Sequence, residues 1–140
     1  MQTVIFEEVV LKIVAQDPRF PREAYNFIRE ALEYTQRMIA KSKKGEVRHV
    51  NGKELLVGLR ELSLEQFGPM AAMVLGEWNI QSCEDVGEIV FNMVEGNLLA
   101  KTEKDTRADF KDGYDFFETF RKPFLPSKTT SPTENKSVQV

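Results

Sequence analysis

The sequence predicts a mainly α-helical domain, a compact bundle of five to six helices, on three observations. Apolar residues recur at three- and four-residue steps over residues 22–44. Helix-capping residues bracket a second such stretch, residues 51–80. A chain of 140 residues with 41% apolar content is long enough to build one core. We therefore expect a single helical domain over residues 1–125, followed by a disordered tail over residues 126–140, where almost nothing can be buried.

Two helices are expected in the first third of the chain. Residues 3–16 place apolar side chains in adjacent pairs four residues apart, which forms one stripe of a helix. That stripe holds Ile5, Phe6, Val9, Val10, Ile13 and Val14. Pro18 and Pro21 then break the chain, because proline disfavours helix in the residue before it. Over residues 22–44 the apolar period is close to 3.6 residues. The inner positions are Ala24, Phe27, Ile28, Ala31, Leu32, Thr35, Met38 and Ile39.

A helical hairpin is expected over residues 51–80. Asn51 is suited to cap a helix N-terminus, and Glu54 stands where a capping box requires a carboxylate. Gly68-Pro69 ends this helix and opens a shorter one. One side of the shorter helix carries Met70, Met73, Val74 and Trp78. Asn79 fits the left-handed conformation that ends a helix.

Ser82 is expected to cap a fifth helix, which Gly96 ends. Its apolar face holds Val86, Ile89, Val90, Met93 and Val94. Residues 97–118 leave two alternatives open. Either Leu98-Leu99 begins a small C-terminal β-hairpin, as in a winged-helix variant of the fold, or a polar residue farther on caps a sixth helical segment.

Cysteine and charge content indicate a cytoplasmic protein. The single cysteine, Cys83, excludes an internal disulfide, and the first residues lack the pattern of a secretory leader. No run of about 18 apolar residues occurs, so no membrane crossing is expected. A net charge of −3 gives no global argument for a nucleic-acid or anionic-membrane partner.

Charge is unevenly distributed along the chain. Residues 41–53 hold one acid and five bases, which form a candidate anion or nucleic-acid patch: Lys41, Lys43, Lys44, Arg48 and Lys53. Residues 54–95 hold eight acids and one base. The favoured interpretation of the basic patch is a helix end whose charge complements the helix dipole, followed by a solvated loop.

The sequence contains no recognisable catalytic or metal-binding constellation. The only histidine, His49, lies far from Cys83, and there is no glycine-rich phosphate loop. Four aspartates over residues 105–115 alternate with bases, which is typical of a salt-bridged surface. We expect no catalytic residue, no metal site and no cofactor. A small-molecule enzyme that uses the acids of residues 103–118 is the least favoured function.

A winged-helix nucleic-acid-binding or regulatory protein is the main alternative function. Residues 82–95 would then form the recognition helix. This helix carries only acids among its charged residues: Glu84, Asp85, Glu88 and Glu95. Phosphates would be repelled where contact is required, so a nucleic-acid partner is disfavoured.

Aromatic residues are concentrated near the C-terminal end. The six are Phe110, Tyr114, Phe116, Phe117, Phe120 and Phe124. One interpretation is that they close the helical core. Because Phe116 and Phe117 are neighbours, they point in different directions, and one of them is expected to face a partner. The expected partner-binding residues are Tyr114, Phe116, Phe117, Phe120 and Arg121. The sequence thus favours a non-enzymatic protein-interaction or adaptor domain with a protein partner.

Two resemblances accompany these patterns. The motifs DPRFPREAYNFIREALEY, HVNGKELLVGLRELSLEQFGPMA, GEIVFNMVEGNLLAKTEKDTRADF and YDFFETF resemble a small uncharacterised bacterial family of verrucomicrobial and planctomycetal type, over residues 1–124. This likeness implies a cytoplasmic protein and supplies no catalytic residues. PREAYNFIREALEY, HVNGKELLVGLREL and AAMVLGEWNI are similar to one helical repeat of the N-terminal domain of Clp-type unfoldases. That likeness implies a protein-binding helical unit, without the second repeat or the ATPase modules.

Overall fold

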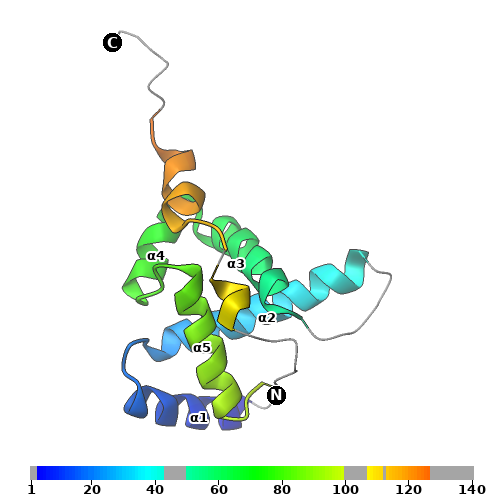
Figure 1. Cartoon of the computed structure of the whole chain (residues 1–140), viewed down its shortest axis with the longest axis vertical. Coiled ribbons are helices and arrows are strands. Elements are labelled where there is room, and N and C mark those ends of the chain that lie inside the picture. The colour runs from blue at the N-terminus through cyan, green and yellow to red at the C-terminus, as the bar shows by residue number, and fades with distance from the viewer. Residues whose placement is uncertain (1–2, 43–49, 100–106, 112, 127–140) are drawn as a thin grey trace, which may run out of the picture.

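The packing of α2 against α3 forms the centre of the structure (Figure 1). The computed structural model describes residues 3–42, 50–99, 107–111 and 113–126. Within these residues there are five α-helices: α1 Thr3–Gln16, α2 Arg22–Ser42, α3 Gly52–Phe67, α4 Ala71–Glu77 and α5 Cys83–Glu95. They also contain the 3-10 turns η1 Gly68–Met70, η2 Arg107–Phe110 and η4 Lys122–Phe124, and the π turn η3 Phe117–Arg121. The predicted mainly helical fold is confirmed.

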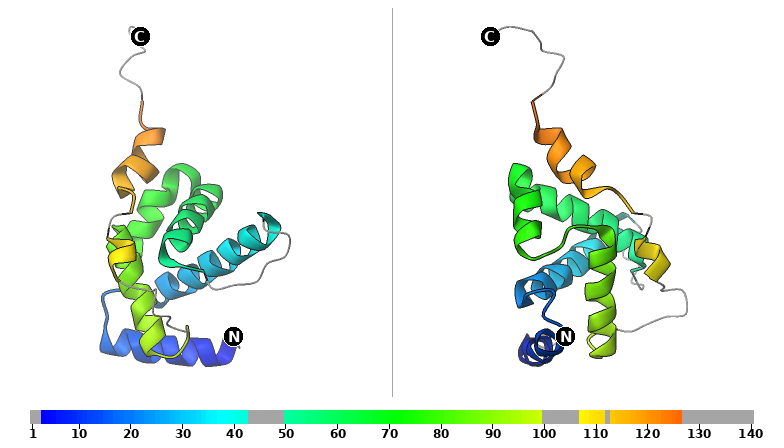
Figure 2. Two further views of the ribbon diagram at one scale, coloured as in Figure 1. Left: turned by 45° about the vertical axis from the view of Figure 1, so that its right-hand side comes forward. Right: turned by 60° about the vertical axis from the view of Figure 1, so that its left-hand side comes forward.

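The helices are arranged between two opposite ends of the molecule. α1 lies across one end, and the C-terminal turns η3 and η4 lie at the other (Figures 1 and 2). α5 connects these regions, because it contacts α1, α2 and α3. α4 packs against α3 and η3. The C-terminal turns therefore rest on the α3–α4 hairpin, far from α1.

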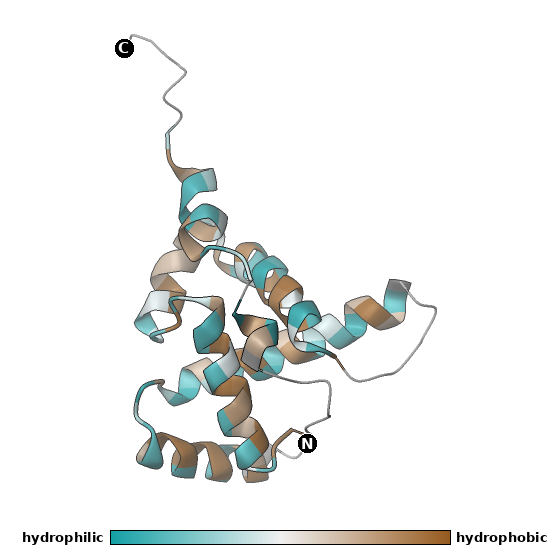
Figure 3. Ribbon diagram, in the orientation of Figure 1, coloured by the Kyte–Doolittle hydropathy of each residue, from teal (hydrophilic) through white to brown (hydrophobic). Residues whose placement is uncertain are grey.

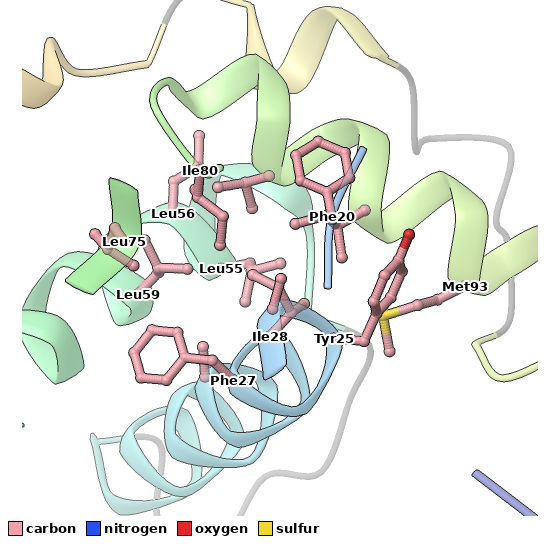
Figure 4. Close-up of a cluster of buried hydrophobic side chains, with 14 of the residues drawn as sticks. Phe20, Tyr25, Phe27, Ile28, Leu55, Leu56, Leu59, Leu75, Ile80 and Met93 are labelled. Atoms are coloured by element: carbon pink, nitrogen blue, oxygen red, sulfur yellow. The ribbon is translucent and has the colours of Figure 1, made fainter. Parts of the chain in front are cut away.

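The core lies between the central helices (Figure 4). Its largest fully buried side chains include Phe20, Tyr25, Ile28, Leu55, Leu59, Leu75, Ile80 and Met93. Burying one such side chain stabilises the fold by about 1.5–3 kcal/mol. The predicted inner face of α2 is buried from Ala24 to Thr35, except that Leu32 is half-buried. Met38, which was expected on the same face, is exposed because it borders an open groove between α2 and α3.

α2 and α3 approach each other most closely at Gly58. A Cβ atom placed at this glycine would lie 1.8 Å from Thr35 Oγ1 and 3.0 Å from Thr35 Cβ. Thr35 is buried, and its hydroxyl donates a 2.7 Å hydrogen bond to the Ala31 carbonyl one turn earlier in α2. The Thr35 hydroxyl therefore has its hydrogen-bond partner within α2. At position 58 of the facing helix there is room for the hydrogen atom of glycine but not for a side chain.

Helix ends follow the capping signals of the sequence. The Glu54 amide donates to Asn51 Oδ1 at 2.8 Å and the Asn51 amide donates to Glu54 Oε1 at 3.1 Å, which completes the predicted capping box. Ser82 Oγ accepts from the Asp85 amide as expected. Asn79 has φ 62°, the left-handed conformation predicted for it. Beyond α5 the left-handed residue is Asn97, with φ 64°, whereas Gly96 has φ −83°.

The predicted β-hairpin, and with it the winged-helix variant, is not supported. No strand occurs in residues 50–99, 107–111 or 113–126, and η2 occupies part of the ambiguous segment. The Phe110 ring of η2 lies between α3 and α5, where Cβ atoms at Gly52 and Gly87 would come within 2.9 and 2.8 Å of it. Through this contact η2 packs against α3 and α5. Of the predicted tail, only Pro126 belongs to the described residues.

The side of the short helix that carries Met70, Met73, Val74 and Trp78 is only partly covered. Val74 and Trp78 are half-buried, and the Trp78 ring centroid lies 5.3 Å from that of Phe27. The buried residues of α4 are Ala71 and Leu75, whereas Met70 and Met73 are exposed. Two large apolar side chains thus remain at the surface.

A polar network ties the α1–α2 connection to α5. The Arg19 guanidinium donates to both carboxylate oxygens of Asp17, through Nε at 2.9 Å to Oδ1 and Nη2 at 2.7 Å to Oδ2. Asn92 Nδ2 of α5 donates to Asp17 Oδ2 and to the Tyr25 hydroxyl, both at 3.0 Å. The hydrogen bonds from Arg19 hold the pKa of the Asp17 carboxyl well below its usual range.

We expect Gly58→Ala to lower the free energy of unfolding by about 1–3 kcal/mol, because the added methyl group overlaps Thr35 and forces α2 and α3 apart. The matched control is Gly76→Ala in α4, where no atom lies within 4 Å of the new Cβ. This control should gain up to about 1 kcal/mol from helix propensity alone. Urea denaturation of the two variants measures the difference. Equal effects would contradict the close approach.

Asp17→Asn is expected to reduce the loss of stability in acid. A carboxyl whose pKa is lower in the folded state stabilises the fold above its unfolded pKa, near 3.8, and loses this contribution as the pH falls below that value. The variant should therefore be less stable at neutral pH and show a shallower decline from about pH 5 to about pH 2. Thermal unfolding across this range provides the measurement, with Glu77→Gln on the exposed side of α4 as the control. Parallel curves for wild type and Asp17→Asn would contradict it.

Candidate interaction surface

The C-terminal segment, residues 113–126, is anchored to the helical bundle through Tyr114. Its hydroxyl donates a 2.7 Å hydrogen bond to the Leu56 carbonyl of α3. The Cys83 thiol of α5 donates to the Tyr114 carbonyl at 3.4 Å. Burial raises the pKa of Tyr114, so the phenol keeps the proton that it donates. The segment is thus attached to both α3 and α5.

Aromatic rings continue this anchor along the segment. The Tyr114 and Phe116 rings stack with their centroids 5.8 Å apart. Phe120 lies edge-on to both rings, at 5.9 Å from Tyr114 and 4.9 Å from Phe116. Phe120 was expected to contact a partner, but its exposed fraction is 0%, because η3 packs against α4 at this point. It belongs to the core, while Tyr114 and Phe116 are half-buried.

The next ring along the chain faces solvent. Phe117 is 52% exposed, because successive residues of a helical turn point about 100° apart and Phe116 occupies the inward direction. Phe124 and Leu125 of the same segment are similarly exposed. We call the side chains of Phe117, Phe124 and Leu125 the C-terminal apolar surface. Apolar and polar stretches alternate along the ribbon in this region (Figure 3).

Positive charge accompanies the C-terminal apolar surface. Arg121, one of the predicted partner-binding residues, is exposed on η3. Lys122 forms an exposed ion pair with Glu118, with Nζ 3.2 Å from Oε2. Arg60 of α3 lies over the Tyr114 ring, 5.8 Å from its centroid. Basic side chains thus flank the rings on the η3 and α3 sides.

The predicted basic patch is only partly described. Lys41 lies in the last turn of α2 and Lys53 in the first turn of α3, and both are exposed. Lys43, Lys44 and Arg48 lie outside the described residues, as does His49. On α5, which would be the recognition helix of a winged-helix protein, Glu84 and Glu95 are exposed and Glu88 pairs with Arg19 at 3.3 Å.

The groove between α2 and α3 is a surface feature that sequence reasoning missed. It has a volume of about 480 Å³. Met38 of α2 and Val57 and Gly58 of α3 are among the residues that line it, and the side chains of Met38 and Val57 are exposed. The helical period placed Met38 inward, and no local signal indicates that the two helices leave this end of their interface open.

Groups with chemical reactivity are sparse in the described residues. Cys83 is buried, and burial raises the pKa of its thiol to about 11, so the thiol stays protonated near neutral pH. Among residues 3–42, 50–99, 107–111 and 113–126, no group of three or more His, Cys, Asp and Glu side chains is placed to hold a metal ion. Asp115 accepts a hydrogen bond from the Glu118 amide and so caps the first turn of the C-terminal segment.

Comparisons with protein-family models, with curated proteins and with solved structures find no match to this chain. No helix in the described part of the chain is long and apolar enough to span a lipid bilayer.

We expect Tyr114→Phe to lower the free energy of unfolding by about 1 kcal/mol, because the hydrogen bond to the Leu56 carbonyl is lost. Hydrogen exchange of the amides in residues 113–126 should accelerate at the same time, since the anchor of this segment is weakened. Tyr34→Phe is the matched control, because the Tyr34 hydroxyl donates only a long, exposed 3.4 Å bond to Glu61. An unchanged exchange rate in Tyr114→Phe would show that the hydroxyl does not hold the segment.

Proposed function

We propose that this chain is a non-enzymatic protein-interaction domain, an adaptor, that binds a partner protein through the C-terminal apolar surface. The observation that carries the proposal is the difference in exposure between two phenylalanines of η3. Phe120 is fully buried in the domain, while Phe117, one turn earlier, is 52% exposed beside it. Exposed large apolar side chains that cluster on one surface are typical of sites where another protein binds.

The position of Phe117 favours binding because its surroundings are already ordered. The Tyr114 hydroxyl donates to the Leu56 carbonyl, and the Phe120 ring contacts the rings of Tyr114 and Phe116. These contacts hold η3 in place on the domain. A partner would therefore order few additional groups on this side of the interface, and ordering groups is a main cost of association. Covering the exposed half of the Phe117 side chain contributes about half of the ~1.5–3 kcal/mol gained on full burial, and packing contacts with the partner add to this.

Charge at the rim of the C-terminal apolar surface indicates the chemistry of the partner. Arg121 is exposed next to the apolar side chains, and Arg60 lies on the neighbouring face. A complementary segment carries apolar side chains for the centre and an acid that meets Arg121. The occupant proposed is thus an amphipathic, acidic segment of another protein.

Site-specific crosslinking in cells tests the proposal. A photoreactive phenylalanine analogue placed at Phe117 should crosslink one defined protein. The same analogue at Leu11 of α1, which is 56% exposed at the opposite end of the molecule, should not (Figure 1). With that protein purified, Phe117→Ala should weaken binding by at least about tenfold and Leu11→Ala should leave it unchanged.

Reversal of charge provides an independent measurement on the same complex. Arg121→Glu should slow association, and the difference from wild type should shrink as salt is raised. Equal binding by the Phe117 and Leu11 variants would overturn the proposal. Crosslinks of Phe117 only to a second copy, with a dimer in sedimentation analysis, would replace the adaptor by self-association. A shift of duplex DNA by the purified chain, abolished by Lys41→Glu, would favour the nucleic-acid alternative instead.

A further inference from the structure

A second site, a concave pocket open on one side, lies between α2, α3 and α5, on a different part of the molecule from the C-terminal apolar surface. It is a pocket of about 360 Å³. Its walls are largely apolar and come from all three helices and from η2; they include Leu32, Leu55, Val90, Phe91, Val94 and Phe110. A concave site of this size with apolar walls is suited to a small organic ligand.

One arginine is the only positively charged residue among those that line the pocket. Arg29 of α2 lines it, and the guanidinium carbon lies 4.4 Å from the centroid of the buried Phe6 ring. Arg29 Nε is buried and has no hydrogen-bond partner among the residues that the structure describes. The guanidinium stays charged at all physiological pH values, so it cannot adapt to burial by losing its proton.

Arg19 shows how the same chain satisfies an arginine elsewhere. Its guanidinium makes a two-pronged contact with Asp17 and a further hydrogen bond with Glu88. Arg29 has the ring of Phe6 on one face but no carboxylate of the described chain within ion-pair distance. The guanidinium fork is complementary to a carboxylate, and the contact is strongest where water is excluded.

We propose that this pocket binds a small monocarboxylate with an apolar body, such as a medium-chain fatty acid. The carboxylate pairs with Arg29, and the hydrocarbon chain lies along the walls formed by α2, α3 and α5. Burial of the hydrocarbon supplies the affinity, while the arginine selects for the charged end.

The remaining lining residues argue for a single negative charge. Glu33 lies one turn after Arg29 and is exposed at the edge of the pocket, with Gln36 beside it. A carboxylate at the edge disfavours multiply charged anions such as phosphate, because the one arginine cannot balance them. Apolar walls also offer a hydrated inorganic anion no hydrogen bonds.

Calorimetric titration of the full chain with decanoate tests the proposal, with 1-decanol and inorganic phosphate as the matched ligands. We expect saturable binding of one decanoate per chain, at least about tenfold tighter than 1-decanol, and no measurable binding of phosphate. Arg29→Met should bring decanoate down to the affinity of 1-decanol. Arg37→Met, an exposed arginine elsewhere on α2, should bind decanoate as wild type does.

Two further measurements keep the test independent of how the Arg29 variants fold. Val94→Phe fills the pocket from α5 and should weaken decanoate and 1-decanol alike. In the wild-type protein, decanoate should shift the NMR signals of Val90, Val94 and Leu98, and leave those of Phe117 and Leu125 in place. Equal decanoate affinity in wild type and in a folded Arg29→Met, or shifts confined to the C-terminal apolar surface, would overturn the proposal.

Discussion

The close approach of α2 and α3 at Gly58 is the constraint on which the other helices depend. No side chain separates the two helices at Gly58, so the neighbouring residues of α3 pack closely against α2. Leu55 and Leu59 thereby contribute to the same core as Ile28 and Tyr25 (Figure 4). α5 then closes this core from the other side, and α4 and the C-terminal turns are positioned by the end of α3. An extra methyl group at Gly58 would push α2 and α3 apart, and this displacement would be transmitted to all of these elements.

Local chemistry predicted most of the helical boundaries. The capping box of Asn51 and Glu54, the Ser82 cap and the left-handed Asn79 depend on neighbours in sequence, so their geometry can be inferred without the tertiary structure. Side-chain direction was harder to infer. Met38 and Met73 follow a helical period yet are exposed, because the burial of a side chain depends on which other elements cover its helix, as the groove beside Met38 shows.

The same distinction applies to the candidate sites. The excess of aromatic residues near the C-terminal end predicted a partner surface in that segment, and the divergence of neighbouring rings indicated that one of Phe116 and Phe117 would be exposed, as Phe117 is. That Phe120 belongs to the core depends on α4, which lies far away in sequence. Arg29 escaped notice because an arginine beside an apolar stripe is ordinary in an amphipathic helix. Its unusual environment is created by Phe6 of α1 and by walls from α5.

The position of Phe110 has a consequence for how this sequence can change over time. Its ring fits against bare backbone at Gly52 and Gly87, which lie on different helices and are far apart in the chain. A larger residue at either glycine is compatible only with a smaller one in place of the ring, and a smaller ring would leave an empty space that alanine at a glycine could fill. The three positions are therefore coupled. In homologous chains they should substitute together, as a covarying set that links the N-terminal halves of two helices to a segment far along the sequence.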